Sequence, residues 1–444
     1  MSALVRGAVA IESTRIAADA DHFWVAVHLD ARAAEERRVR LVLAIDRSST
    51  MAGYRLAAAK RAALTLVMLA RDGDELGLVT FDAEVRTVRE PAPIDADSRA
   101  ALIEAIDAVE AGRGTALAGA TERALLLAST DASSPGEGHA IVLTDGFPFV
   151  GETDLEKIVA LVSLSAQGAT LSTIGFGDEL DGPLLAAMAE AGLGRFVHLG
   201  EHDDLTVALA AELASAARAL TRRAQITVQV RDACVIGCRE VPDGQRAATV
   251  ELSRPPLVAG ERATWAFAIQ PAKPLGAGAH SIGLVTVRTL DREGRPVVVE
   301  LPIRIEVGAR AGELDADVMR ARCLGHAAKA IRTAVTSGAD AREIGRMLER
   351  VAARIEGQAS VAGLANDAAI SAALGVLRDE AALMLAGEPA PRTAASAVAM
   401  GLEQGYDAQI GSKVSTMAPL RRESQVAGIE RTMVLVLPEL RPRS

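Results

Sequence analysis

Three oxygen-bearing side chains follow the apolar run Leu41–Ile45. Asp46 ends the run, and Ser48 and Thr50 come after it at spacings of two. A loop that curves around a point can direct one carboxylate and two hydroxyls to the same place. Hard oxygen donors of this kind suit Mg²⁺, which prefers near-octahedral oxygen coordination and retains several waters. The stretch therefore indicates a divalent-cation site at the end of a strand.

Two further stretches supply side chains of the same kind. Gly112 and Gly114 belong to a loop between two helical segments and allow the turn that would present the Thr115 hydroxyl. The apolar run Ile141–Thr144 ends in a second aspartate, Asp145. Short aliphatic runs are typical of strands buried on both faces of a parallel sheet, and ligands bind at the carboxyl ends of such strands. We therefore expect the three stretches to meet at one edge of a sheet.

The order of these pieces resembles the von Willebrand factor type A family. Its metal-ion-dependent adhesion site combines an Asp-x-Ser-x-Ser loop, a separate Thr and a separate Asp. The resemblance covers roughly residues 38 to 218 and continues in Gly77–Phe81, Thr173–Glu179 and Gly194–Leu199. It departs from the family pattern at Thr50, where Ser is usual, and at Ser49, where Gly is common. The hydroxyl at position 50 is kept, but its added methyl group could crowd an ion.

The resemblance implies a site for Mg²⁺, with Mn²⁺ or Ca²⁺ as alternatives. The expected metal residues are Asp46, Ser48, Thr50, Thr115 and Asp145. From charge and reach, we expect the hydroxyls to coordinate the ion directly and the carboxylates to act largely through water or by holding the hydroxyls. An ion bound in this way keeps an open position for a Glu or Asp of another protein. Such a desolvated charge contact can contribute about 2 kcal/mol or more to binding.

Composition limits the alternatives. The chain has 444 residues, enough for two or three domains, and half of them are hydrophobic but only 2% are aromatic. Its formal net charge of -10 argues against a nucleic-acid partner. We find no signal peptide and no apolar stretch long enough to cross a membrane. Three cysteines do not form a disulfide framework, so we expect a cytoplasmic protein.

Hydrophobic periodicity predicts the domain organisation. Residues 8 to 34 contain an alternating segment, Phe23 to Leu29, and alternation returns after Ala224, whereas helical and strand patterns alternate from 38 to 218. The predicted fold is α/β: a doubly wound, mainly parallel sheet, inserted in or followed by an antiparallel β-sandwich, with a C-terminal helical region. The expected parts are residues 1–36 (strands that pair with the sandwich), 37–220 (metal-site domain), 221–309 (sandwich), 310–387 (helices) and 388–444 (a mobile tail with a short strand at Met433–Leu437).

Several other motifs have simpler explanations. A strand that ends in Asp-x-Ser-x-Thr can also be a helix N-cap, and this alternative applies to the loop at Asp46. A Ser-His-Asp hydrolase through His198 lacks a nucleophile-elbow pattern. The acidic residues near Asp203 fit a solvated helix start, and Cys234 and Cys238 have no second cysteine pair for zinc. The Arg-Arg-Glu-Ser sequence at Ser424 resembles a kinase site, a match that is common by chance.

We therefore predict a non-enzymatic, cytoplasmic interaction factor in which Mg²⁺ binds an acidic residue of a partner protein. The order of parts is similar to bacterial type A domain proteins related to the inter-alpha-trypsin inhibitor heavy chains. By that resemblance, an AAA+ ATPase or a kinase or phosphatase module is the expected partner, with no nucleic acid and no membrane involved. Two alternatives stay open: a structural scaffold that binds no metal, and a metal-dependent hydrolase, for which no general base is evident in the motif loops.

Overall fold

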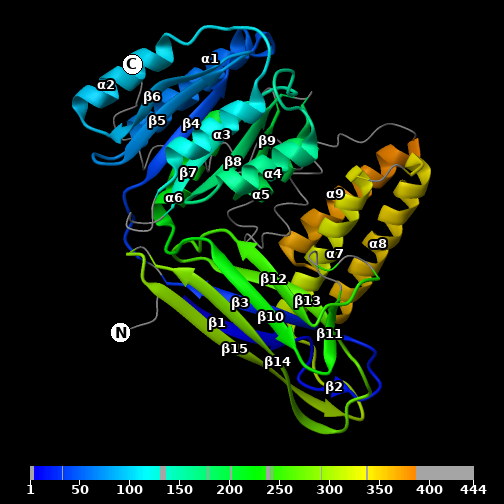
Figure 1. Cartoon of the computed structure of the whole chain (residues 1–444). Helices are drawn as coiled ribbons and strands as arrows, with labels where there is room; N and C mark the ends of the chain where they lie inside the picture. Colours follow the sequence, from blue (N-terminus) through cyan, green and yellow to red (C-terminus); the bar gives the residue numbers. More distant parts are fainter. Residues whose placement is uncertain are drawn as a thin grey trace, which may run out of the picture.

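The computed structural model describes residues 5–32, 34–130, 137–177, 180–200, 203–236, 241, 244–291, 293–336 and 339–386. These residues form an α/β domain, a β-sandwich and a group of three helices, which occupy separate regions in Figure 1. The α/β domain is inserted into the chain between two strands of the sandwich.

A six-stranded sheet of order β6-β5-β4-β7-β8-β9 lies at the centre of the α/β domain. All of its neighbouring strands are parallel except the β5–β6 pair, which is antiparallel. This arrangement confirms the predicted fold class. The strands are β4 (Arg40–Asp46), β5 (Glu75–Phe81), β6 (Val85–Pro93), β7 (Gly138–Thr144), β8 (Ala169–Phe176) and β9 (Leu193–Leu199).

Helices cover both faces of this sheet. One hydrophobic cluster joins the sheet to α1 (Tyr54–Leu69), α2 (Ala96–Asp107) and α6 (Leu205–Arg218). A second cluster, on the opposite face, joins it to α3 (Leu117–Ala128), α4 (Leu155–Ser165) and α5 (Gly182–Ala191).

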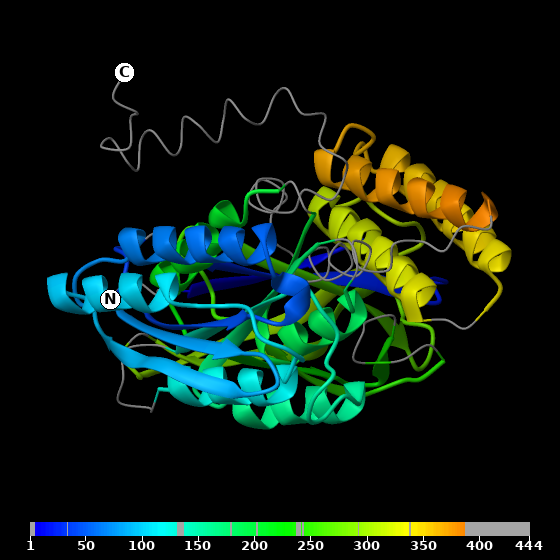
Figure 2. The ribbon, with the colours of Figure 1, turned by 90° about the horizontal axis from the view of Figure 1, so that it is seen from above.

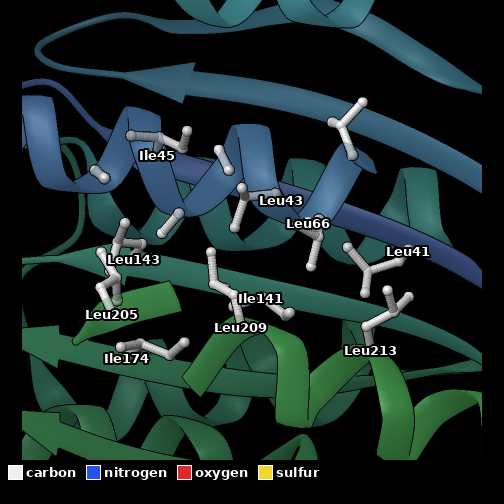
Figure 3. Packing of buried hydrophobic residues seen from close by; sticks show 14 of the residues in the cluster. Leu41, Leu43, Ile45, Leu66, Ile141, Leu143, Ile174, Leu205, Leu209 and Leu213 are labelled. Carbon is white, nitrogen blue, oxygen red and sulfur yellow. The ribbon is translucent and has the colours of Figure 1, made fainter. Parts of the chain in front are cut away.

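Strand β4 is buried on both faces because its side chains alternate between these two clusters. Leu41, Leu43 and Ile45 point to the first cluster, and Val42 and Ala44 to the second. Figure 3 shows the first three beside leucines of α6 and residues of β7 and β8. Full burial of one such side chain contributes about 1.5–3 kcal/mol to folding stability. This packing fixes the register of β4 in the sheet, and therefore the position of its last residue, Asp46, at the sheet edge.

The β-sandwich consists of two sheets, and its neighbouring strands are antiparallel except for the two-residue parallel pairing of β15 with β2. The N-terminal strand β3 pairs with β1 on one side and with β13, from beyond the α/β domain, on the other. One sheet contains β1 (Val5–Ile11), β3 (Phe23–Ala31), β13 (Arg262–Pro271) and β11 (Ala233–Ile236). The other contains β12 (Thr249–Arg254), β10 (Ala224–Val230), β14 (Gly278–Leu290), β15 (Pro296–Gly308) and β2 (Ile16–Ala17).

Three helices follow the sandwich: α7 (Ala316–Thr336), α8 (Ala341–Val361) and α9 (Ala368–Ala386). They share an aliphatic core, and α7 also packs on the sandwich through Val318, which lies against Trp24, Ala26 and Ala268. In Figure 2 the three helices lie together at one side of the molecule. The segment 388–444, with the strand expected at Met433–Leu437, lies outside the described residues. Among the described helices, none combines the length and apolar character required to cross a membrane.

Candidate metal centre

The first group of site residues lies where β4 ends and α1 begins. Asp46 is fully buried as the last residue of β4, and Ser48 is 2% exposed. A short 3-10 helix, η1 (Ser49–Met51), follows, and its buried Met51 anchors the loop in the core beneath the site. Gly53, with φ of 82°, supplies the left-handed turn into α1. The loop is therefore fixed below by packing, while Thr50 is exposed on its outer side.

Both oxygens of the Asp46 carboxylate accept hydrogen bonds from the protein. The backbone N–H of Ser48 donates to Oδ1 over 2.8 Å, and the hydroxyl of Thr144 donates to Oδ2 over 2.6 Å. Thr144 is the last residue of β7, the strand next to β4. This residue was not among the predicted site residues. Its signal in the sequence is a hydroxyl directly before the second aspartate, at the end of an apolar run.

A chain of hydroxyls then connects the loop to Asp145. The hydroxyl of Thr50 donates to Oδ1 of Asp145 over 2.9 Å. Ser48 Oγ lies 2.9 Å from Thr50 Oγ1. Because the single hydroxyl proton of Thr50 is used for Asp145, Ser48 is the donor in this second bond. The lone pairs of the Ser48 oxygen stay available, as a metal ligand requires.

The Thr115 loop is held against this group by backbone contacts. The N–H of Gly112 donates to the carbonyl of Arg47 over 2.6 Å, and a side chain at position 112 would collide with Asp82. The carbonyl of Thr115 accepts from the N–H of Phe149 over 3.0 Å. Gly114, with φ of 78°, makes the turn that precedes Thr115.

Gly146 shows that the Thr50 and Thr115 hydroxyls share one space. A Cβ placed on Gly146 would lie 3.8 Å from Thr50 Oγ1 and 3.9 Å from Thr115 Oγ1. The side chain of Thr115 is buried, so its hydroxyl faces this space and is not directed to solvent. The structure thus brings four predicted residues, Asp46, Ser48, Thr50 and Asp145, into one hydrogen-bonded cluster and places Thr115 next to it.

The two carboxylates differ in how their charge is compensated. Burial raises the pKa of Asp46 to about 6, even though hydrogen bonds from Thr144 and Ser48 lower it. Asp145, whose side chain is fully buried, forms an ion pair of 2.7 Å between its Oδ2 and a guanidinium nitrogen of Arg55. At the rim, Arg47 and Asp82 form another ion pair of 2.7 Å.

The residues present fit a magnesium ion in their chemistry. All of the candidate ligand atoms are hard oxygens, and hydroxyls predominate near the space above Gly146. Both oxygens of Asp46 already accept protein donors, an arrangement that agrees with the expected role of this carboxylate through water. Within the described ranges, no cluster of three or more His, Cys, Asp and Glu side chains could hold a metal ion. The candidate site differs from such clusters because it combines hydroxyls with two carboxylates.

The other motifs have structural roles where the structure describes them. His198 Nε2 donates to the carbonyl of Gly177 over 2.9 Å. Asp204 caps α6 by accepting from the N–H of Thr206, and Asp203 accepts from Gly200. Cys234 lies on β11, whereas Cys238 and Ser424 lie outside the described residues.

The part of the chain that contains the candidate site matches a known protein family. Residues 41–147 match the family described as von Willebrand factor type A domain. A curated relative, the uncharacterized protein sll0103 from Synechocystis sp., is 30% identical over 161 residues, which are 36% of this chain and 37% of that protein. The chain therefore matches well under half of this relative's length.

Two solved structures share the fold over most of the chain. The von Willebrand factor type A protein from Catenulispora acidiphila has a TM-score of 0.62 and 20% identity, with 86% of this chain and 96% of that chain covered. The ArnB paralog VWA2 from Sulfolobus acidocaldarius has a TM-score of 0.58 and 16% identity, with 91% and 99% covered. At these identities the likeness concerns the fold, including the parts beyond the α/β domain.

Proposed function

Because the chain contains a von Willebrand factor type A domain, we propose that it is a non-enzymatic, metal-dependent protein-binding factor. Domains of this family generally mediate protein–protein interactions, often with a metal ion. In this proposal Ser48, Thr50 and Thr115 coordinate Mg²⁺, and Asp46 and Asp145 act mainly through water and through the hydroxyls that they hold. An ion bound there supplies an electrophilic position for a Glu or Asp side chain of a partner protein.

The observation that carries the proposal is the hydrogen-bonded connection between β4 and β7. Thr144 at the end of β7 donates to Asp46 at the end of β4, and Thr50 after β4 donates to Asp145 after β7. The two strand ends are therefore connected by two side-chain hydrogen bonds. An N-cap alone would not need this connection, because its side chain would accept from the next helix's N–H groups. The 3-10 helix that follows Ser48 has no side-chain cap hydrogen bond, and the same is true of α1 after Gly53. The geometry therefore supports the metal interpretation over the capping one.

The charge of the site supports an acidic partner. Asp46 and Asp145 contribute two negative charges when both are ionised, and Arg55 contributes one positive charge. A divalent ion would leave the cluster with a net charge of about +1, which attracts a carboxylate. In this respect the loaded site contrasts with the whole chain, whose formal net charge is -10.

Exposed aromatic side chains next to the site suggest the rest of the partner's contact. Tyr54, Phe147 and Phe149 are 50%, 43% and 69% exposed. All three closely follow metal-site residues in the chain: Tyr54 begins α1 just after the loop that contains Thr50, and the two phenylalanines follow Asp145. Among the described residues, these are the large aromatic side chains that stand exposed. We call them the aromatic rim, and we propose that it binds apolar side chains beside the partner's acidic residue.

Calorimetric titration tests metal binding. We expect Mn²⁺ and Mg²⁺ to bind the wild-type chain, and Asp46→Ala to abolish the heat of binding. Asp72→Ala is the matched control, because Asp72 is 88% exposed and pairs with Arg99 away from the site. Wild type and Asp72→Ala that bind no ion would exclude the metal-dependent function.

Paired synthetic peptides test capture of an acidic residue. Each pair carries Glu or Gln between two leucines, and binding is read by fluorescence anisotropy with Mg²⁺ or with a chelator. The expected result is that the Glu peptide binds more tightly than its Gln partner only when Mg²⁺ is present. Equal binding of the two peptides would show that the ion does not select a carboxylate.

A metal-free scaffold is the second candidate, and the ion pair of Arg55 with Asp145 is the observation that favours it. In that case the guanidinium would compensate the buried carboxylate permanently. The calorimetric experiment separates the two candidates, since the scaffold would bind no ion. The partner class expected from the resemblance, an AAA+ ATPase or a kinase or phosphatase module, and the cytoplasmic location stay predictions.

A further inference from the structure

The ion pair between Arg55 and Asp145 places a positive charge at the edge of the proposed metal site. The guanidinium lies 2.7 Å from Oδ2 of Asp145, whose Oδ1 accepts the Thr50 hydroxyl. The Arg55 side chain is 21% exposed and the Asp145 side chain is fully buried. The pair is therefore shielded from solvent, and its strength is reduced little by salt.

The surrounding fold keeps Arg55 in this position. Its neighbour Tyr54 packs edge-on against Phe176 at the end of β8, with ring centroids 6.3 Å apart. The backbone at Gly177 lies directly against the guanidinium, because a Cβ there would be 3.4 Å from its central carbon. Gly177 also has φ of 113°, a conformation that other residues rarely adopt. A side chain at position 177 would thus contact the guanidinium and strain the loop.

The two oxygens of Asp145 have different partners as a result. Oδ1 faces the hydroxyl chain of Thr50 and Ser48, whereas Oδ2 is held by Arg55. Asp46 differs, because its two oxygens accept from a hydroxyl and a backbone N–H. A buried carboxylate without a cation is costly, so the ion pair with Arg55 stabilises Asp145 in this position when no ion is bound.

We propose that Arg55 is a resident counter-cation that holds the metal-free site in its binding geometry and limits its affinity for the divalent ion. This inference rests on the proposed metal-dependent function and adds a residue that determines the affinity of the site for the ion. The positive charge repels an incoming Mg²⁺ and reduces the negative charge that Asp145 offers to it. It also leaves more positive charge for a partner's carboxylate once the ion is bound. Ion and partner should then bind with positive coupling.

The test compares Arg55→Met with Arg55→Lys. Met keeps an unbranched apolar stem but removes the guanidinium and its charge, so we expect Mn²⁺ affinity to rise on the order of tenfold. Lys keeps the charge, and its affinity should stay within about threefold of wild type. Melting temperature in a chelator gives a second readout: Arg55→Met should be less stable than wild type without metal and should gain more from added Mn²⁺.

Arg99→Met is the matched control. The Arg99 side chain is also 21% exposed, and it pairs with Asp72 and donates to the backbone carbonyls of Val67 and Ala70 at the C-terminal end of α1. Its loss should lower the melting temperature without a change in Mn²⁺ affinity. An equal change in affinity for Arg55→Met and Arg99→Met would assign the effect to general destabilisation and overturn the inference.

The outcomes separate this inference from the proposed function. If wild type binds Mn²⁺ and Arg55→Met binds it equally or less tightly, the role of Arg55 is wrong and the metal-binding function stands. Ion binding by Arg55→Met but not by wild type would overturn the proposed function of the native protein, because Arg55 would then replace the metal permanently. If neither protein binds an ion, the proposed function fails and the inference fails with it.

Discussion

Thr50 and Asp145 are joined by a hydrogen bond of 2.9 Å, although 95 positions separate them in the sequence. They follow β4 and β7, which are neighbours in the sheet. The threonine reaches the aspartate with its hydroxyl, and its extra methyl group does not prevent this contact. The departure from the usual serine therefore leaves the hydroxyl chain of Ser48, Thr50 and Asp145 intact.

Substitution of Thr50 should separate the role of its hydroxyl from that of its methyl group. Thr50→Val keeps the shape but removes the oxygen, and we expect it to lower Mn²⁺ affinity at least tenfold. Thr50→Ser should bind the ion as tightly as wild type or more tightly, because the hydroxyl has more room. Both affinities can be measured by calorimetry.

Thr65→Val is the control for this pair. Thr65 lies on α1, and its hydroxyl donates to the carbonyl of Arg61 within the same helix. This substitution should not change Mn²⁺ affinity. If Thr50→Val binds the ion like Thr65→Val, the hydroxyl of Thr50 is not a ligand.

The sheet could be predicted from the sequence because strands that are buried on both faces consist almost entirely of apolar residues. The run Leu41–Ile45 has no polar residue, as expected of a strand covered by helices on both faces, and Asp46 stands out because it ends this run. The α/β fold class and the helical region were predicted correctly from patterns of this kind. For the α/β domain, the resemblance to a known family added to these patterns.

Contacts between segments that are far apart in the chain were harder to predict from the sequence. The role of Thr144 depends on the register of β7 against β4, which no single segment specifies. Arg55 looks like an ordinary polar residue in the first turn of a helix, and only the fold brings it to Asp145. Phe147 and Phe149 look like core residues by type, yet they are exposed, because they lie in the loop after β7 and not in a strand or helix.

The aromatic rim gives a prediction about the partner. Phe149→Ser should weaken Mg²⁺-dependent binding of the Glu peptide about tenfold or more, as expected for an aromatic contact at an interface. The change should leave Mn²⁺ affinity and melting temperature nearly unchanged, because the side chain is 69% exposed. Leu164→Ser, at a position 77% exposed on α4, is the control and should not affect peptide binding. Equal losses for the two variants would argue against a specific rim.

A buried ionic network in the α/β domain should control its acid stability. Glu212 on α6 is 1% exposed and lies 2.7 Å from Arg195 and 2.9 Å from His139. Burial alone would raise its pKa, but Arg195 and His139 outweigh this effect and lower the pKa to about 2. The unfolded chain therefore binds more protons than the folded one as pH falls from about 4.5 to 2, and stability is lost in that window.

Glu212→Gln removes the charge that compensates Arg195. We expect a loss of about 3 kcal/mol or more in the free energy of unfolding at pH 7, measured with urea, and a weaker pH dependence below about pH 4.5. Glu75→Gln is the control, because the Arg40–Glu75 pair is about one-third exposed and should contribute less than about 1 kcal/mol. A similar small loss for both variants would show that the buried network does not hold the domain.

His326 should make the attachment of the helical region to the sandwich sensitive to pH. It lies on α7 and packs edge-on against Trp24 of β3, with ring centroids 5.2 Å apart. Burial, followed by the nearby charges of Arg322, Arg354 and Lys329, lowers its pKa to about 4. The folded state therefore keeps this histidine neutral under conditions in which the unfolded chain protonates it.

The sign of the effect follows from proton binding. The unfolded chain binds the extra proton between about pH 6.5 and pH 4, so the contribution of His326 to stability is present above pH 6.5 and is lost as pH falls toward 4. Between pH 7 and pH 5 we expect wild type to lose about 2 kcal/mol more than His326→Phe, which keeps a ring against Trp24 but cannot be protonated. Urea unfolding at the two pH values measures this difference.

His22→Phe, at a position where the side chain is 41% exposed, should behave like wild type. Equal pH dependence of wild type and His326→Phe would show that His326 is not the group responsible, whereas the expected difference would assign this part of the acid sensitivity to the buried histidine at the α7–β3 contact.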